Sequence, residues 1–246
     1  MTEGTAISGL IDINTRFGRD MRRGVVTSPE EIKRAGQRWG VTRVYTCSYR
    51  AIQFDCEEGN RETLELCAAD SYFRPVAVAC PTGIYSPVRV ARLRELGFAM
   101  VRLFPEVHGY AVDSAACARL VEALDEMGMP VMLPTVDSEP TRITHLLRGR
   151  EGTFILCRNR YHVLGELLAL ADSLPSACVE TSDLVTPDGI AAVSKAFSPS
   201  RVLWGSGYPM LNVGSTVMVL RGSGLGTEEL TMVASGNARR LLEAGR

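Results

Sequence analysis

Eight short runs of apolar residues recur along the chain, and each is followed by a segment with helical patterning. The runs are rich in valine, isoleucine, leucine and cysteine, as expected of parallel strands that are covered on both faces. They span residues 9–16, 41–49, 73–81, 100–106, 130–136, 153–158, 176–183 and 201–209. The pattern predicts an α/β protein built as a (β/α)₈ TIM barrel, whose active site lies at the carboxyl ends of the strands.

The helical segments carry recognisable start and stop signals. Ser28-Pro29-Glu30-Glu31 combines an N-cap, a proline at the first helical position and acidic residues in the first turn. Asp113 is predicted to cap a helix over 114–127, which Gly128 ends. A last helix is predicted over about 227–243. Similar start signals stand at Ser86-Pro87 and Thr186-Pro187-Asp188.

Nothing in the sequence divides the chain into parts. Its 246 residues suit a single barrel, and no low-complexity linker interrupts them, so residues 1–246 are predicted to form one domain. The main alternative is a doubly wound open sheet. No glycine-rich turn follows the first predicted strand, which disfavours that alternative.

Composition and charge exclude several classes of protein. The net charge of −1 argues against nucleic-acid and membrane-surface partners, and no apolar run approaches the roughly 20 residues of a membrane span. Met1–Gly9 is too short to be a secretory signal. The seven cysteines are scattered without paired spacing, which favours a reducing cytoplasm over a disulfide framework. We therefore expect a cytoplasmic protein.

Four motifs resemble those of a known family. They are Ile11-Asp12-Ile13-Asn14-Thr15-Arg16-Phe17-Gly18, Gly97-Phe98-Ala99-Met100-Val101-Arg102-Leu103-Phe104-Pro105-Glu106, Gly205-Ser206-Gly207-Tyr208-Pro209 and Gly236-Asn237-Ala238-Arg239-Arg240-Leu241. In these the chain resembles the amidohydrolase-related (metal-dependent hydrolase) family, in the branch that includes decarboxylases and lactonases. The resemblance implies an amidohydrolase-like barrel with a His-x-His pair after the first strand, histidines on the fifth and sixth strands and an aspartate on the eighth.

This sequence departs from the family pattern at every one of those metal-ligand positions. The His-x-His pair falls on Asn14 and Arg16, the next two histidines on Pro134 and Arg158, and the aspartate on Gly207. Zinc requires imidazole, thiolate or carboxylate ligands, whereas proline and glycine offer none and arginine repels a cation. We therefore expect no metal and no other cofactor.

Arginines stand where the metal would be. Arg16, Arg102 and Arg158 are expected near the mouth of the barrel, where their planar guanidinium groups match carboxylates or phosphates. With Asn14 and Glu106 they form the predicted substrate-binding set for a small anionic ligand. Arg50 and Arg160 are weaker candidates. The alternative is that neighbouring carboxylates neutralise the arginines, the candidates being Asp12, Glu106, Glu180 and Asp183.

Two histidines are candidates for proton transfer. His108 follows the fourth predicted strand and His162 the sixth, so both are predicted to be catalytic residues on the active-site side. The third, His145, belongs to a helix and is interpreted as structural. Cysteines at strand ends are alternative nucleophiles, although buried core thiols are common. They are Cys47, Cys80 and Cys157.

Two functions are consistent with these features. The first is a metal-independent enzyme of the hydrolase, lactonase, decarboxylase or cyclase type that acts on a small anionic molecule. The second is a catalytically inactive pseudoenzyme that serves as a binding or scaffold subunit. The resemblance also implies a homodimer or pairing with a related barrel. Apolar residues add support if they face outward, namely Trp39, Phe73, Phe197 and Val217-Met218-Val219-Leu220.

Overall fold

The structure of the protein is a computed structural model that describes residues 7, 9–81, 87–136, 140–186 and 188–243. Within these residues, every predicted apolar run contains a strand. The strands are β1 (Leu10–Asp20), β2 (Val25–Thr27), β3 (Val41–Ser48), β4 (Phe73–Ala79), β5 (Met100–Leu103), β6 (Val131–Pro134), β7 (Phe154–Cys157), β8 (Ala177–Glu180) and β9 (Val202–Leu203). β2 was not predicted. It is a short antiparallel partner of the end of β1.

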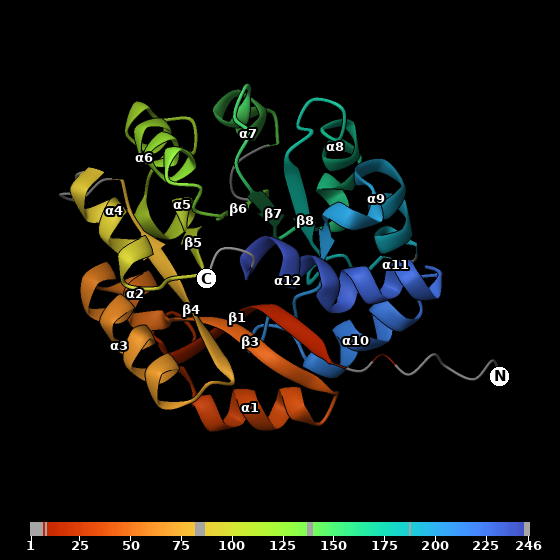
Figure 1. The fold of residues 1–246 in the computed structure, drawn as a ribbon, viewed down its shortest axis with the longest axis horizontal. Helices are drawn as coiled ribbons and strands as arrows, with labels where there is room; N and C mark the ends of the chain where they lie inside the picture. The colour runs from red at the N-terminus through yellow and green to blue at the C-terminus, as the bar shows by residue number, and fades with distance from the viewer. Residues whose placement is uncertain (1–6, 8, 82–86, 137–139, 187, 244–246) are drawn as a thin grey trace.

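The sheet follows the order of the chain. Its order is β2-β1-β3-β4-β5-β6-β7-β8-β9, and every pair from β1 to β9 is parallel. A doubly wound sheet requires a reversal of strand order, which this sheet lacks, so the alternative fold is wrong. Figure 1 shows the sheet curled, with helices around its outside.

The two ends of the curled sheet approach each other. The Ile13 amide donates to the carbonyl oxygen of Trp204 over 3.4 Å, and the Arg16 amide donates to that of Tyr208 over 3.1 Å. The Ser206 amide donates to Asp12 Oδ1 over 2.8 Å. Among the described residues these bonds, rather than a strand ladder, connect β1 to the segment after β9. The α/β class and the barrel-like strand order are therefore confirmed, and the sheet is a curled one without full closure.

Most helices lie on the outer face of the sheet (Figure 1), whereas α2 and α12 contribute residues to the apolar cluster inside the curl. The α-helices are α1 (Pro29–Gln37), α2 (Tyr49–Gln53), α3 (Cys56–Ala69), α4 (Pro87–Glu95), α5 (Pro105–His108), α6 (Ala115–Glu126), α7 (Pro140–Leu147), α8 (Leu164–Ala169), α9 (Gly189–Phe197), α10 (Val213–Arg221), α11 (Thr227–Thr231) and α12 (Asn237–Leu242). The helix predicted over about 227–243 is present as one continuous helical stretch from Thr227 to Leu242, in which a π-helical segment at Met232–Gly236 lies between α11 and α12.

The predicted caps are partly confirmed. The Ser28 side chain accepts from the Glu31 amide while Glu31 accepts from the Ser28 amide, so α1 begins with a full capping box. α6 is capped by Ser114, whose hydroxyl accepts from the Cys117 amide. The prediction of Asp113 as this cap was wrong by one residue, because Asp113 lies outside the first turn and pairs with Arg142. Ser86 and Pro187, from the two other start signals, lie outside the described residues.

Replacing Ser28 by alanine should lower the free energy of unfolding by about 1 kcal/mol, because the Glu31 amide would lose its acceptor. Urea unfolding would measure the change. Ser173→Ala, at an exposed serine outside any cap, is the matched control and should have little effect. An equal loss in the two variants would contradict the capping account.

Side chains of the sheet alternate between two apolar clusters. Val131, Leu133 and Phe154 pack towards the surrounding helices, whereas Met132 and Ile155 belong to the cluster inside the curl. This two-sided burial explains the continuous apolar runs in the sequence. No helix in the described part of the chain is long and apolar enough to cross a membrane.

Most of the apolar residues that were offered as evidence for self-association pack inward. Phe73, Phe197, Val217 and Leu220 are buried, and Trp39 is half-buried against α10. Val219 is partly buried against the same core, whereas Met218 is 56% exposed. The evidence is therefore wrong for the side chains that fill the layer between sheet and helices, and among these residues Met218 alone is exposed. Self-association remains a prediction.

Candidate functional site

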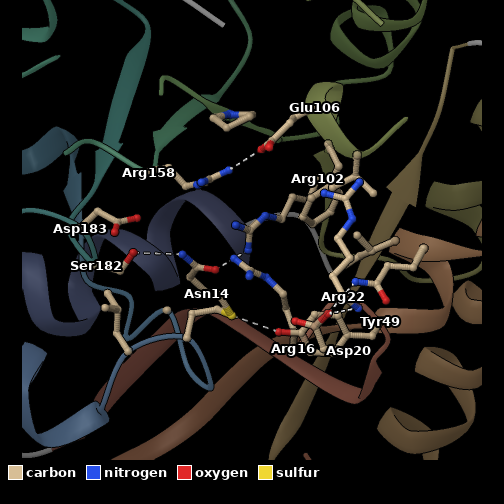
Figure 2. A pocket seen from close by; sticks show the side chains of 18 of the residues that line it. Asn14, Arg16, Asp20, Arg22, Tyr49, Arg102, Glu106, Arg158, Ser182 and Asp183 are labelled. Carbon is tan, nitrogen blue, oxygen red and sulfur yellow. Dashed lines mark hydrogen bonds and ion pairs between the residues drawn. The ribbon is translucent and has the colours of Figure 1, made fainter. Parts of the chain in front are cut away.

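A cavity of about 300 Å³ lies at the carboxyl ends of the strands. All five predicted substrate-binding residues line it, and Arg160 does so as well. In the described part of the chain its wall carries six arginines and three carboxylates, so positive charge predominates. The arginines are Arg16, Arg22, Arg23, Arg102, Arg158 and Arg160, and the carboxylates are Asp20, Glu106 and Asp183. Figure 2 labels seven of these side chains around the cavity, namely Arg16, Arg22, Arg102, Arg158, Asp20, Glu106 and Asp183.

Arg102 is the most deeply buried of these cations. It stands on β5 with 3% of its surface exposed, and its Nη1 donates to Asn14 Oδ1. Its guanidinium carbon lies 5.0 Å from the centre of the Phe104 ring. Burial lowers the pKa of Arg102, and the nearby charge of Arg16 lowers it further. A cation desolvated to this extent favours an anion beside it.

Arg16 has an unused hydrogen-bond donor in the same wall. Its Nε is buried and has no partner among the described residues, although buried donors are nearly always satisfied. Its guanidinium carbon lies 5.9 Å from the centre of the Phe104 ring, the ring that Arg102 also contacts. Figure 2 shows Arg16 and Arg102 beside Asn14. The two arginines can therefore offer donors to one ligand group.

Arg158 lies on the opposite wall in a different setting. Its backbone has φ +57°, and its Nη1 lies 3.4 Å from Glu106 Oε2. The Glu106 side chain is 57% exposed, so this pair contributes little to stability. The expectation that carboxylates neutralise the arginines thus holds for Arg158. Arg50 is paired too, with Glu58 at 2.5 Å, and it lies outside this cavity.

Two other carboxylates serve different partners. Asp12 Oδ1 accepts from the backbone amides of Asn14 and Ser206, and burial raises the pKa of Asp12. Glu180 is fully buried at the end of β8. Its Oε1 accepts from the Ser182 amide over 2.7 Å. Neither carboxylate is within ion-pair distance of an arginine in the described residues. These contacts do not support the prediction that Asp12 and Glu180 neutralise the arginines directly.

Glu180 and Ser182 form a unit that the sequence analysis missed. Glu180 Oε2 accepts from the Ser182 hydroxyl over 2.9 Å and from Asn14 Nδ2 over 3.0 Å. Burial raises the pKa of Glu180 to about 7, although the Ser182 amide and hydroxyl and Arg102 oppose the shift. Ser182 lines the cavity. The signal in the sequence was an acidic residue at the end of an apolar strand, which we interpreted only as a counterion.

The predicted catalytic histidines do not line the cavity. His108 Nε2 lies 2.9 Å from the carbonyl oxygen of Ile52, and His162 is exposed in the 3₁₀ turn Tyr161–Val163. The short α5 begins at Pro105 and directs Glu106 and Val107 to the cavity, while His108 faces α2. Their roles in proton transfer stay predictions, and this geometry does not bring them to the arginines.

The cysteines suggested as nucleophiles are poor candidates. Burial raises the pKa of Cys47, and it raises that of Cys157 to about 12. Cys80 is half-buried and does not line the cavity. Since the thiolate is the nucleophilic form, Cys47 and Cys157 are held in the unreactive state near neutral pH.

Comparison with known families identifies the class of protein. The model of the amidohydrolase family matches residues 47–244, and this chain belongs to that family. No curated protein sequence matches the chain significantly.

Solved structures agree on the fold at low sequence identity. 2,6-Dihydroxybenzoate decarboxylase from Rhizobium superposes with a TM-score of 0.77 at 12% identity, covering 97% of this chain and 100% of that one. Dihydroxybenzoic acid decarboxylase from Polaromonas sp. JS666, with bound manganese and the inhibitor 2-nitroresorcinol, superposes with a TM-score of 0.78 at 14% identity. The match covers 97% of this chain and 98% of that one. 5-Carboxyvanillate decarboxylase from Sphingomonas paucimobilis superposes with a TM-score of 0.76 at 14% identity, covering 96% of this chain and 99% of that one.

The residues of this chain do not fit a metal like the manganese of the Polaromonas structure. The described residues contain no group of three or more histidine, cysteine, aspartate or glutamate side chains arranged to hold a metal ion. Asn14 stands at one of the two positions that the resemblance assigns to the His-x-His pair, and its Oδ1 already accepts from the Arg102 guanidinium. The donors around the cavity are therefore mainly cations, which suit an anion and oppose a metal ion.

Proposed function

We propose that this protein is a metal-independent enzyme of the amidohydrolase family that acts on a small anionic molecule, held through a carboxylate by Arg16 and Arg102. The observation that carries the proposal is the buried Arg102 guanidinium near Arg16 (Figure 2), whose Nε has no partner in the described part of the chain. Two guanidinium groups can bind a carboxylate through charge-assisted hydrogen bonds. By the family resemblance, Arg16 stands at a position of the metal-binding pair, so its positive charge would take the place of a metal.

This arrangement also provides a means of catalysis. A guanidinium beside a carbonyl or carboxylate oxygen stabilises negative charge that develops there in a transition state. That stabilisation serves a hydrolase, lactonase, decarboxylase or cyclase reaction alike, and the fold alone does not select among them. Phe104, which lies against both arginines, supplies an apolar surface for the body of the ligand. We also infer that the curled sheet functions as a closed barrel, with the bonds from β1 to the segment after β9 completing the ring.

The second candidate is a binding subunit without catalysis. Its support is that neither His108 nor His162 lines the cavity, so the predicted proton donors are remote from the proposed ligand. Incubation of the protein with a panel of aromatic carboxylates and lactones, followed by chromatography of the products, distinguishes the enzyme from the binding subunit. Turnover that Arg102→Met abolishes supports the enzyme, whereas tight binding with every compound recovered intact supports the binding subunit.

Small carboxylates such as benzoate should raise the melting temperature of the wild-type protein. A ligand that binds only the folded state at a hundred times its Kd stabilises it by about 2.7 kcal/mol. Arg16→Ala should remove most of this response in a thermal-shift assay, because it deletes a free donor and a charge. Arg148→Ala, at an exposed arginine outside the cavity, is the control and should respond like wild type. An unchanged response in Arg16→Ala would show that the ligand site lies elsewhere.

A further inference from the structure

The hydroxyl of Ser182 connects the cavity to a buried carboxylate. Ser182 lines the cavity, whereas Glu180 is fully buried and does not. The Ser182 hydroxyl donates to Glu180 Oε2 over 2.9 Å, and Asn14 Nδ2 lies 3.2 Å from the same hydroxyl oxygen. Ser182 is therefore the polar group through which a ligand in the cavity can reach Glu180.

Asn14 connects the same carboxylate to the arginines. Its Oδ1 accepts from Arg102, and its Nδ2 donates to Glu180 Oε2. The Asn14 amide is neither an acid nor a base near neutral pH, so it fixes the geometry and leaves the Ser182 hydroxyl as the group that can relay a proton. A ligand anion that compensates the charge of Arg102 therefore weakens the electrostatic support for ionised Glu180.

The backbone leaves space for this carboxylate. A Cβ atom at Gly205 would lie 2.3 Å from Glu180 Oε1 and 2.9 Å from Asn14 Cβ, so a larger residue at this position would displace them. The other charged or titratable groups that act on Glu180 are Arg102 on β5, Cys157 on β7 and Asp183 after β8. Of these only Arg102 favours the ionised form.

We propose that Ser182 is a catalytic residue that passes a proton between the bound ligand and Glu180, which stores it. In one direction the ligand or an attacking water gives a proton to Ser182 Oγ while Ser182 gives its hydroxyl proton to Glu180 Oε2. In the other direction the two transfers reverse and the ligand is protonated. No electrons are exchanged and no further reactant is required. The inference rests on the proposed ligand site and adds the proton-transfer group that the histidines do not supply.

Isothermal titration with benzoate tests the storage of the proton. At neutral pH, in two buffers of different ionisation enthalpy, wild-type protein should take up a fraction of a proton on binding. Glu180→Gln should bind without this uptake, and the exposed control Glu166→Gln should retain it. Binding without uptake in wild type, or uptake that persists in Glu180→Gln, would overturn the inference. A complete failure of benzoate to bind would instead contradict the proposed function.

Infrared difference spectra test the same group without a ligand. Spectra recorded below and above neutrality should contain a protonated-carboxyl band that Glu180→Gln lacks and Glu166→Gln keeps. If Glu180→Gln keeps every such band, Glu180 does not store the proton, and this conclusion does not depend on whether benzoate binds.

Stopped-flow measurements with a pH indicator test the route through Ser182. Ser182→Ala should take up the proton at least tenfold more slowly than wild type after mixing with benzoate. Ser182→Thr retains a hydroxyl and should recover most of the rate. If Ser182 had only a structural role, Ser182→Ala would change the stability of the protein but not the rate of proton uptake. An unchanged rate of uptake in Ser182→Ala would therefore show that the proton does not pass through Ser182.

Discussion

Replacing Arg102 by methionine should weaken benzoate binding by about ten- to a hundredfold. Methionine retains much of the side-chain length and removes the buried charge that the Phe104 ring and Asn14 hold in place. Hydrogen bonds to charged groups contribute about 1.5–3 kcal/mol, which corresponds to that range of affinity. Isothermal titration gives the dissociation constant directly.

Two further variants make the Arg102 result specific. Arg102→Lys keeps the charge but loses the planar pair of donors, so it should bind with an intermediate affinity. Arg148→Met makes the same substitution at an exposed arginine and should leave binding unchanged. Circular dichroism should show that each variant is folded. A folded Arg102→Met protein with wild-type affinity would contradict the proposed anion site.

Replacing Glu180 by glutamine should change how stability depends on pH. Burial raises the pKa of Glu180 from 4.5 to about 7, so the folded protein binds a proton that the unfolded chain has lost between these pH values. The stability that Glu180 contributes is therefore present below about pH 4.5 and is lost as pH rises to about 7. Relative to Glu180→Gln, the wild type should lose on the order of 3 kcal/mol across this interval and then show no further change.

The slope of the free energy of unfolding against pH, rather than its absolute value, is the quantity to compare between the variants. Glutamine at this position sets an amide donor against the donor Nδ2 of Asn14, which carries a constant cost of its own. Urea unfolding at several pH values gives the slope, and Glu166→Gln should parallel the wild type because that side chain is exposed. A constant difference between wild type and Glu180→Gln would mean that Glu180 titrates normally.

Much of the fold could be predicted because strands buried on both faces leave a clear apolar pattern. Seven of the eight parallel strands fall within the predicted runs, β1 extends past its run of 9–16 to Asp20, and the capping box at Ser28 is present. β2 was missed because it has three residues, two of which are exposed, and it gains its structure only by pairing with β1. The π-helical segment between α11 and α12 likewise leaves no signal in the apolar spacing.

The site could be predicted only as far as strand ends could be located. Arg16, Arg102 and Arg158 were placed correctly at the cavity, because strand C-termini meet at one edge. His108 was expected there too, but sequence position does not fix the direction of a side chain on a short turn such as α5. The contact between Asn14 and Glu180 joins β1 to β8 across 166 residues, and it depends on the three-dimensional curl of the sheet.

We propose that arginine charge, and no metal, binds the anion in this cavity. The most direct test of this proposal is titration of benzoate into protein stripped with a chelator and shown by elemental analysis to be free of manganese and zinc. The account predicts binding to this metal-free protein, the same weakening by about ten- to a hundredfold in Arg102→Met, and no gain in affinity on adding manganese. Binding that appears only after manganese or zinc is restored would contradict it.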